Sequence, residues 1–105
     1  MKLGTVQHVF SRSEGDKAKF EKAKAAGFHG IEPDLTVADL DDAAQARLAS
    51  LKAARDATGL PIPSLCIGAH NMEGFVFASW RGSKPVEEIR KAVRWCHALG
   101  ANVLL

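Results

Sequence analysis

The 105-residue sequence has few cysteines: only Cys66 and Cys96, which lie far apart and both in apolar surroundings. No C-x-x-C pair is present, which excludes a thioredoxin-type motif and a zinc knuckle. We therefore expect both residues to be buried free thiols in a reducing compartment rather than partners in a disulfide.

Long hydrophobic runs and an excess of one charge are also missing. No apolar run approaches the ~20 residues that a membrane-spanning helix requires, and no charged segment followed by an apolar one opens the chain. We predict a cytoplasmic protein with no membrane partner. The 14 basic and 12 acidic residues leave a net charge of +2, which is too small to indicate nucleic-acid binding. Neither G-x-G-x-x-G nor a Walker loop is found, so the sequence has no glycine-rich phosphate-binding signature.

The sequence pattern predicts that strands and helices alternate along the chain. Apolar and β-branched runs predict strands over 2–10, 28–32 and 102–105 and a further strand that begins at Ile62 and ends before His70. Helical spacing predicts helices over about 13–26, 41–58 and 83–99. Each helix ends at a glycine that can adopt a left-handed conformation, namely Gly27, Gly59 and Gly100. Such alternation implies parallel strands joined by right-handed crossovers, in an open doubly wound sheet or in a (β/α)8 barrel of ~250 residues.

Local signals predict the bounds and buried faces of these elements. Ser13 and Asp16 form a capping-box-like helix start, and Asp41 is a plausible N-cap of the second helix. Pro33 is expected to stop the second strand, with 34–42 as a loop or short helical turn. The apolar run that begins at Ile62 predicts a strand buried on both faces. The residues expected to face the core are Phe20, Ala23, Ala44, Leu48, Leu51, Ala54, Val86, Ile89, Val93 and Cys96.

The sequence stops inside an apolar strand, at 103–105. A bare apolar strand edge is an aggregation hazard. We therefore expect residues 1–105 to be the N-terminal half of a single barrel domain, supplying about the first three βα units and strand four. The alternative is an independent half-barrel, as a dimer that pairs its edges.

Polar residues follow the predicted strands: Gln7 and His8 after the first, Glu32 after the second, and His70 with Asn71 after the third. The carboxyl ends of parallel strands share one edge, where barrel enzymes assemble their sites. Two histidines and a carboxylate could bind a divalent metal, orient a sugar hydroxyl or move protons. Structural roles remain open, with His8 bonded to backbone carbonyls and Glu32 capping the next turn or pairing with a lysine.

Other candidates lie away from the strand ends. Trp80 and Arg81 belong to a long loop after the third strand, where Trp could stack on a sugar ring and Arg could meet a phosphate. The alternative is a hydrophobic loop that packs on its own scaffold. His29 precedes the second strand and is expected to have a structural role at the opposite end of the sheet, and His97 is expected to lie on the surface or in packing.

Four segments of the sequence carry a family resemblance: MKLGTVQHVF, AAGFHGIEP, SLCIGAHN and ALGANVLL. Together they resemble the N-terminal half of the sugar phosphate isomerase/epimerase family, in the xylose isomerase-like TIM-barrel superfamily. The resemblance implies a (β/α)8 barrel, with the catalytic residues in the other half. It also implies a divalent metal (Mn, Mg, Co or Zn) whose ligands lie mostly outside this chain. In the endonuclease branch a histidine after strand three binds zinc, which makes His70 a weak metal candidate.

The resemblance implies that this chain supplies part of a substrate pocket, and the predicted substrate-binding residues are Gln7, His8, Glu32, His70, Trp80 and Arg81. The predicted function is a metal-dependent sugar or sugar-phosphate isomerase or epimerase that transfers a proton next to a carbonyl. Its partner would be a small sugar or sugar phosphate, it could form a homo-oligomer, and the isolated chain would be inactive. The alternatives are an apurinic endonuclease-like DNA repair nuclease and a non-catalytic half-barrel module.

Overall fold

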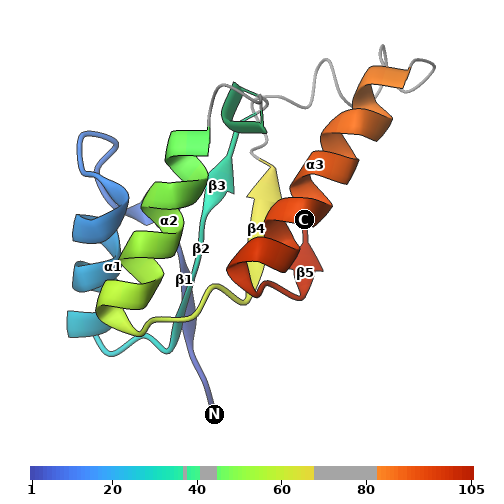
Figure 1. Cartoon of the computed structure of the whole chain (residues 1–105). Helices are drawn as coiled ribbons and strands as arrows, with labels where there is room; N and C mark the ends of the chain where they lie inside the picture. The colour runs from blue at the N-terminus through green and yellow to red at the C-terminus, as the bar shows by residue number, and fades with distance from the viewer. Residues whose placement is uncertain (37, 41–44, 68–82) are drawn as a thin grey trace.

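The elements of the chain follow one another as alternating strands and helices (Figure 1). The computed structural model describes residues 1–36, 38–40, 45–67 and 83–105. The strands are β1 (Gly4–Val6), β2 (Gly30–Glu32), β3 (Asp34–Leu35), β4 (Ser64–Ile67) and β5 (Val103–Leu104). The helices are α1 (Asp16–Ala25), α2 (Gln45–Thr58) and α3 (Ser83–Leu99), with 3-10 turns η1 (Gln7–Val9) and η2 (Ala38–Leu40).

All the described strand pairs are parallel: β1 with β2, β3 with β4, and β4 with β5. Only Pro33 separates β2 from β3. The Ile31 amide donates to the Pro61 carbonyl (3.1 Å), and the Cys66 amide donates to the Pro33 carbonyl (3.0 Å). Ladder pairing thus gives two sets, β1–β2 and β3–β4–β5, which residues 30–35 connect, and the strands lie side by side in chain order.

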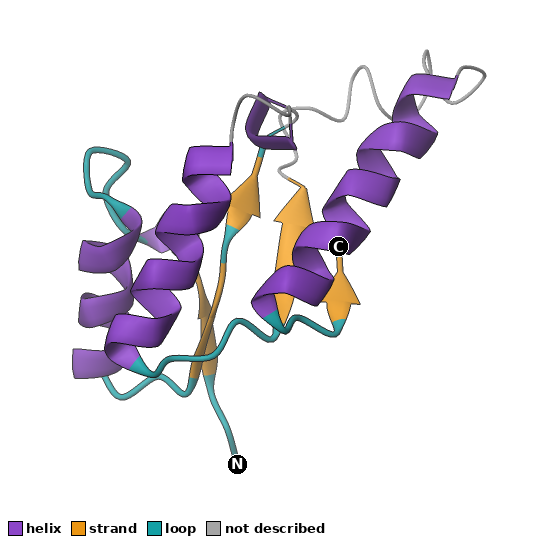
Figure 2. Cartoon of the chain, viewed as in Figure 1, coloured by secondary structure: helices purple, strands orange, loops and turns teal. Residues whose placement is uncertain are grey.

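The helices α1, α2 and α3 cover one face of the sheet, and the other face carries no described helix (Figures 1 and 2). A doubly wound sheet places helices on both faces and reverses its strand order at a switch point. Sequential strands with an outer layer of helices are the arrangement of a (β/α)8 barrel. The described part of the sheet is open, so the fold is a partial barrel, and the predicted fold class is confirmed.

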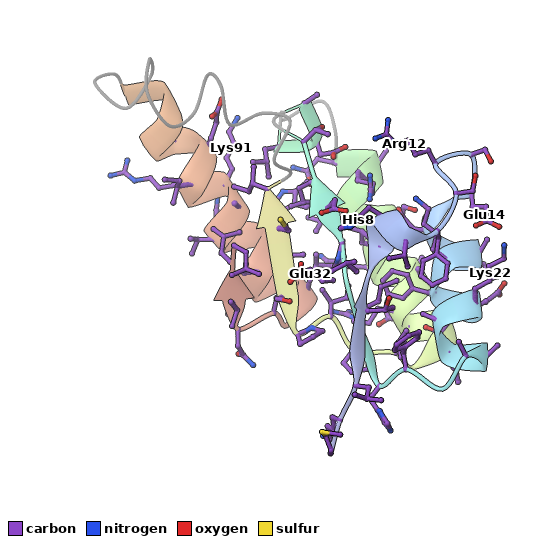
Figure 3. All side chains as sticks on the ribbon, turned by 180° about the vertical axis from the view of Figure 1, so that it is seen from behind. His8, Arg12, Glu14, Lys22, Glu32 and Lys91 are labelled. Carbon is purple, nitrogen blue, oxygen red and sulfur yellow. The ribbon has the colours of Figure 1, made fainter. Side chains whose placement is uncertain are left out.

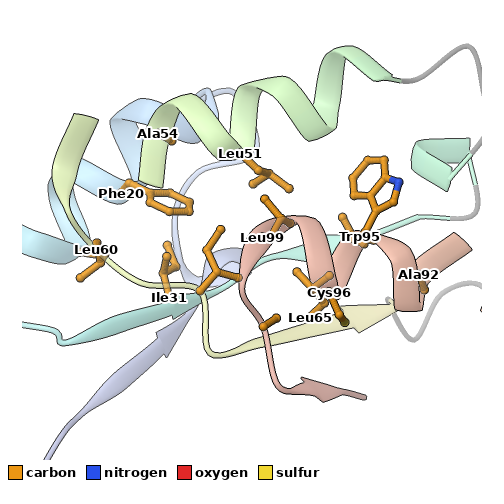
Figure 4. Close-up of a cluster of buried hydrophobic side chains, with 14 of the residues drawn as sticks. Phe20, Ile31, Leu51, Ala54, Leu60, Leu65, Ala92, Trp95, Cys96 and Leu99 are labelled. Atoms are coloured by element: carbon orange, nitrogen blue, oxygen red, sulfur yellow. The ribbon is translucent and has the colours of Figure 1, made fainter. Parts of the chain in front are cut away.

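The hydrophobic core lies between the helices and the sheet (Figure 4). Phe20 of α1 and Leu51 of α2 have no exposed surface, as predicted, and neither do Ile31, Leu35 and Leu65 of the strands. Burial of a side chain of this size contributes about 1.5–3 kcal/mol each. The remaining core residues are Ala23, Leu40, Ala54, Leu60, Ile62, Ala92, Trp95, Cys96, Leu99 and Ala101.

Side chains alternate between the two faces of the strands. Leu65 of β4 is fully buried in the core, whereas its neighbours Ser64 and Cys66 are half-buried. In the same way Leu35 is buried and Asp34 is half-buried. A period of two is that of a strand with one face on a core. The prediction that the third strand is buried on both faces is therefore wrong for the part that is described, Ser64–Ile67.

Each helix ends at the predicted glycine, and all three glycines have positive φ: 85° at Gly27, 69° at Gly59 and 77° at Gly100. After α1, the Phe28 amide donates to the Ala23 carbonyl and the Gly27 amide donates to that of Lys24. This pair of bonds is a Schellman motif, which satisfies carbonyls that the helix end leaves free. The glycine predictions are confirmed.

Two predicted bounds are wrong. The first strand ends at Val6 rather than Phe10, because residues 7–9 form η1. The N-cap of α1 is Gly15, without a side-chain cap, and the Ser13 hydroxyl contacts that of Ser11 at 2.8 Å instead. The second strand ends at Glu32, just before Pro33, as predicted, but residues 34–35, predicted as part of a loop or short helical turn, form β3 and pair with β4. Asp41 and Ala44 lie outside the described residues.

The predicted buried stripe of the third helix is partly wrong. Ile89 is 42% exposed and Val93 is 53% exposed, and the side chain of Val86 lies outside the described part. The residues of α3 that pack on the core are Ala92, Trp95, Cys96 and Leu99. Two apolar stripes overlap on this helix, and the one that contains the large indole of Trp95 faces the core.

Both cysteines are free, as predicted, although only Cys96 is buried and Cys66 is half-buried. No helix in the described ranges combines the length and the apolar character that crossing a bilayer requires.

Candidate functional site

Polar side chains of neighbouring strands gather on the sheet face that the helices leave uncovered. Glu32 of β2 accepts a hydrogen bond from the Ser64 hydroxyl of β4, and Cys66 stands two residues further along β4. Figure 3 views the molecule from this side and labels Glu32 and His8. We call Glu32, Asp34, Ser64 and Cys66 the open-face cluster. It adjoins a hollow of ≈ 360 Å³ lined by Gly4, Thr5, Val6, Glu32, Pro63 and Ser64.

The electrostatics of the open-face cluster are set by its two carboxyl groups. Partial burial raises the pKa of the Cys66 thiol, and the negative charges of Asp34 and Glu32 raise that pKa further. Burial alone raises the pKa of Cys96. A thiol with a raised pKa is protonated at neutral pH and is a poor nucleophile. The cluster therefore provides hydrogen-bond acceptors rather than a reactive thiolate.

His8 lies at the rim of this face and contacts a side chain rather than backbone carbonyls. Its Nδ1 is 2.9 Å from Oδ2 of Asp34, and its side chain is 68% exposed. A carboxylate at one ring nitrogen fixes the orientation of the imidazole and favours a proton on that nitrogen. The other nitrogen, Nε2, is then an acceptor, able to take a proton or a hydrogen bond from a hydroxyl group.

Gln7 lies beside His8 in the chain, but its side chain packs between α1 and α2. It is only 2% exposed, its Nε2 donates to Asp16 Oδ1 (2.5 Å), and its Oε1 accepts from Arg47 Nη2 (3.0 Å). The Ser50 hydroxyl donates to Asp16 Oδ2 (2.7 Å), and Arg47 Nε lies 3.0 Å from the same oxygen. These four residues, Gln7, Asp16, Arg47 and Ser50, are called the Asp16 network. It joins η1 to both helices.

A second and larger cleft, of ≈ 550 Å³, opens beside the end of β1. Its lining comes from η1 and the loop after it, from α1 and α2, and from β3 with the residue that follows. The lining residues are Gln7, His8, Phe10, Arg12, Lys19, Asp34, Thr36 and Arg47. His8 and Asp34 therefore belong both to this cleft and to the rim of the open face.

The structure brings only some of the predicted site residues together. His8 and Glu32 lie on strands that pair with each other or directly follow such strands. His70, Asn71, Trp80 and Arg81 lie outside the described residues. Sequence reasoning missed Asp34 and Ser64, although the period of two from Glu32 to Asp34 was a usable signal. The cations of the cleft were also missed, and nothing in their sequence pattern distinguishes them.

The described residues do not form a metal centre. Among them, no group of three or more His, Cys, Asp or Glu side chains is placed to hold a metal ion. The His8–Asp34 pair supplies two donor groups, whereas protein sites for catalytic zinc commonly supply three. No chemical step through a metal is therefore assigned to these residues.

His29 lies at the opposite end of the sheet, as predicted. Its Nδ1 accepts from the Leu3 amide (3.1 Å), and its own amide donates to the Leu3 carbonyl (2.6 Å). These bonds continue the pairing of β1 with β2 toward their N-terminal ends, which is a structural role. His97 is exposed on α3, in agreement with the expected surface position.

Comparison with known proteins identifies a matching family and a similar solved structure. The family model described as xylose isomerase-like TIM barrel matches residues 20–105. Among solved structures, the apo crystal structure of 3-keto-D-glucoside 4-epimerase from E. coli is similar, with a TM-score of 0.69 and 25% sequence identity. The similarity covers 99% of this chain but 36% of that protein, so the chain spans about a third of its length. A search of curated proteins gives no match.

Proposed function

Because the chain belongs to the xylose isomerase-like TIM-barrel family, we propose that it supplies the substrate-positioning part of a sugar isomerase or epimerase. The observation that carries this proposal is the gathering of Glu32, Ser64 and the His8–Asp34 pair on one uncovered sheet face. Polar groups from successive strands of a barrel are the usual way in which such a fold builds a site.

The chemistry of these groups suits a polyhydroxylated ligand. The carboxylates of Glu32 and Asp34 accept hydrogen bonds from hydroxyl groups, and the Ser64 hydroxyl can both donate and accept. The structural neighbour acts on a 3-keto-D-glucoside. We take a keto-sugar as the substrate class here, because a carbonyl makes the C–H bond on the adjacent carbon acidic enough for proton transfer.

The proposed reaction is an exchange of a proton on the carbon next to the carbonyl. A base removes that proton, the electron pair moves toward the carbonyl oxygen, and a proton returns to carbon. In this scheme His8 orients the substrate, with Nδ1 toward Asp34 and Nε2 toward the ligand. The divalent metal that the resemblance implies would require ligands from outside the described residues, and the proposal gives it no step.

We also propose that the chain is the N-terminal part of one larger barrel domain. Its coverage of 36% of the epimerase chain supports this. The test is the intact mass of the protein from its natural source. A mass near 30 kDa, as expected for about 250 residues, agrees with a whole barrel. A mass of 11.3 kDa, that of these 105 residues, would contradict the proposal.

The functional test is isotope exchange with the protein isolated at its natural length. A 3-keto-D-glucoside is incubated with it in D2O, and loss of the proton signal next to the carbonyl is followed by NMR. We expect Glu32→Gln and His8→Ala each to slow exchange about tenfold or more, equivalent to about 1.4 kcal/mol of transition-state stabilisation. His97→Ala, which alters an exposed histidine on α3, is the control and should leave the rate unchanged.

Two results would overturn the proposal. One is the absence of exchange with any keto-sugar. The other is exchange that Glu32→Gln and His8→Ala leave at the wild-type rate, because the open face would then have no part in the reaction.

A further inference from the structure

The ≈ 550 Å³ cleft beside the end of β1 has a lining that is rich in positive charge. Arg12, Lys19 and Arg47 contribute cations, whereas Asp34 is the only carboxylate among the lining residues. Asp34 is engaged by His8 at 2.9 Å. The formal charge of the lining is therefore +2 with a neutral His8, although the net charge of the whole chain is also only +2.

The cations of the cleft differ in whether they have partners. Arg47 pairs with Asp16 and lies 3.8 Å from Asp39. Arg12 and Lys19, by contrast, have no hydrogen bond or ion pair with any of the described residues. Two cations without a partner among the described residues thus line one cleft: Arg12 in the loop before α1, which Figure 3 labels, and Lys19 on α1 itself.

Lys19 is exceptional among the lysines of α1. Lys17 lies 3.7 Å from Glu21, Lys22 pairs with Glu14, and Lys24 donates to the Thr58 carbonyl. Lys19 lines the cleft, is half-buried, and has no such partner among the described residues. An anion bound in the cleft would provide that partner.

We propose that this cleft binds the phosphate group of a small phosphate ester, with Arg12 and Lys19 as its ligands. An arginine guanidinium presents two parallel N–H groups to phosphate oxygens, and a lysine ammonium adds a point charge. A phosphate monoester carries a charge of about −1.5 to −2 at neutral pH, which matches two unpaired cations.

The position of the cleft connects it with the open face. The His8–Asp34 pair lines the cleft and stands at the rim of the open face, so one ligand can extend from one to the other. The claim that the whole ligand is a phosphorylated keto-sugar rests on the proposed function. Binding of phosphate itself does not, and the test below separates the two.

The test is a binding titration of the protein, followed by NMR chemical shifts, without any turnover. The probes are inorganic phosphate, glucose 6-phosphate, glucuronate and glucose. We expect both phosphates to bind, glucuronate to bind more weakly, and glucose to shift no signals of the cleft. Arg12→Gln and Lys19→Gln should each weaken phosphate binding about tenfold or more, as loss of a charge-assisted hydrogen bond does.

Two further variants control the measurement. Lys17→Gln removes the same charge from α1 at a position outside the lining, and it should leave the affinity for phosphate unchanged. Arg12→Lys keeps the charge and should retain part of the affinity. Equal weakening by Lys17→Gln would reveal non-specific attraction, and wild-type affinity in Arg12→Gln and Lys19→Gln would show that the cleft is not the site. Either result overturns the inference.

The outcome is independent of the exchange experiment. If phosphate does not bind but keto-sugar exchange proceeds, the substrate is unphosphorylated and only this inference fails. If phosphate binds at Arg12 and Lys19 but no exchange occurs, the proposed function fails and the phosphate site stands.

Discussion

Replacement of Asp16 by asparagine tests whether the Asp16 network holds the end of β1 against the helices. Asp16 is 8% exposed, and among the described residues the groups that contact its carboxylate are donors: the Gln7 amide, the Ser50 hydroxyl and the Arg47 guanidinium. An asparagine at this position would bring its own NH2 donor against those donors. It would also remove the negative charge opposite Arg47.

The expected cost follows from the burial of each partner. The Gln7 side chain is 2% exposed, so an unsatisfied Nε2 there costs about 1–3 kcal/mol. Arg47 is 28% exposed and keeps its hydrogen bond to Gln7. Losing the ion pair with Asp16 therefore costs Arg47 less, about 1 kcal/mol. Ser50 is exposed and can bond to water instead. We therefore expect Asp16→Asn to lower the free energy of unfolding by about 2–4 kcal/mol.

The assay is urea unfolding followed by circular dichroism. With a slope of about 2 kcal/mol per molar urea, the midpoint should fall by about 1–2 M. The matched control is Asp56→Asn, because Asp56 is 67% exposed and pairs only with the adjacent Arg55 among the described residues. It should change stability by less than about 0.5 kcal/mol. An Asp16→Asn variant as stable as this control would refute the view that the network stabilises the fold.

The remaining predictions concern the ends of α1 and the thiol of the open-face cluster. Gly27→Ala should destabilise the protein by about 1 kcal/mol, because φ is 85° there. Gly15→Ser should stabilise it by a few tenths of a kcal/mol, since the N-cap of α1 has no side-chain acceptor; thermal unfolding measures both. Asp34→Asn should lower the raised pKa of Cys66 and speed its alkylation by iodoacetamide at pH 8, where more of the thiol would be ionised. Cys96, whose pKa is raised by burial alone, is the internal control, and an equal acceleration at both thiols would contradict the assigned cause.

Local chemistry was sufficient to predict the succession of elements. Gly27, Gly59 and Gly100 each adopt the left-handed conformation that ends a helix, and a strand follows each of them. Hydrogen bonds within a few residues, such as those from Phe28 to Ala23, produce these ends. For that reason they can be recognised without knowledge of the rest of the fold.

Features that depend on tertiary packing, such as strand pairing and the buried face of a helix, could not be predicted from local sequence. Pro33 lacks an amide donor, but its carbonyl still accepts from Cys66, a residue that only the folded sheet brings near. Ile89 and Val93 share helical spacing with the buried Cys96. Which of the apolar side chains of α3 are buried depends on how the helix is oriented on the sheet. Gln7 was placed at the correct strand end, yet η1 turns its side chain toward the helices.

The alternation of side chains along β2, β3 and β4 has a consequence for how this protein can change over generations. Residues 31, 35 and 65 are committed to the core, while 32, 34, 64 and 66 face away from it. A combinatorial library confined to the second set would vary the uncovered face and leave the buried layer intact. Selection can act on the same four codons separately from those of the buried residues, so single substitutions can change the chemistry of this face while the core stays packed.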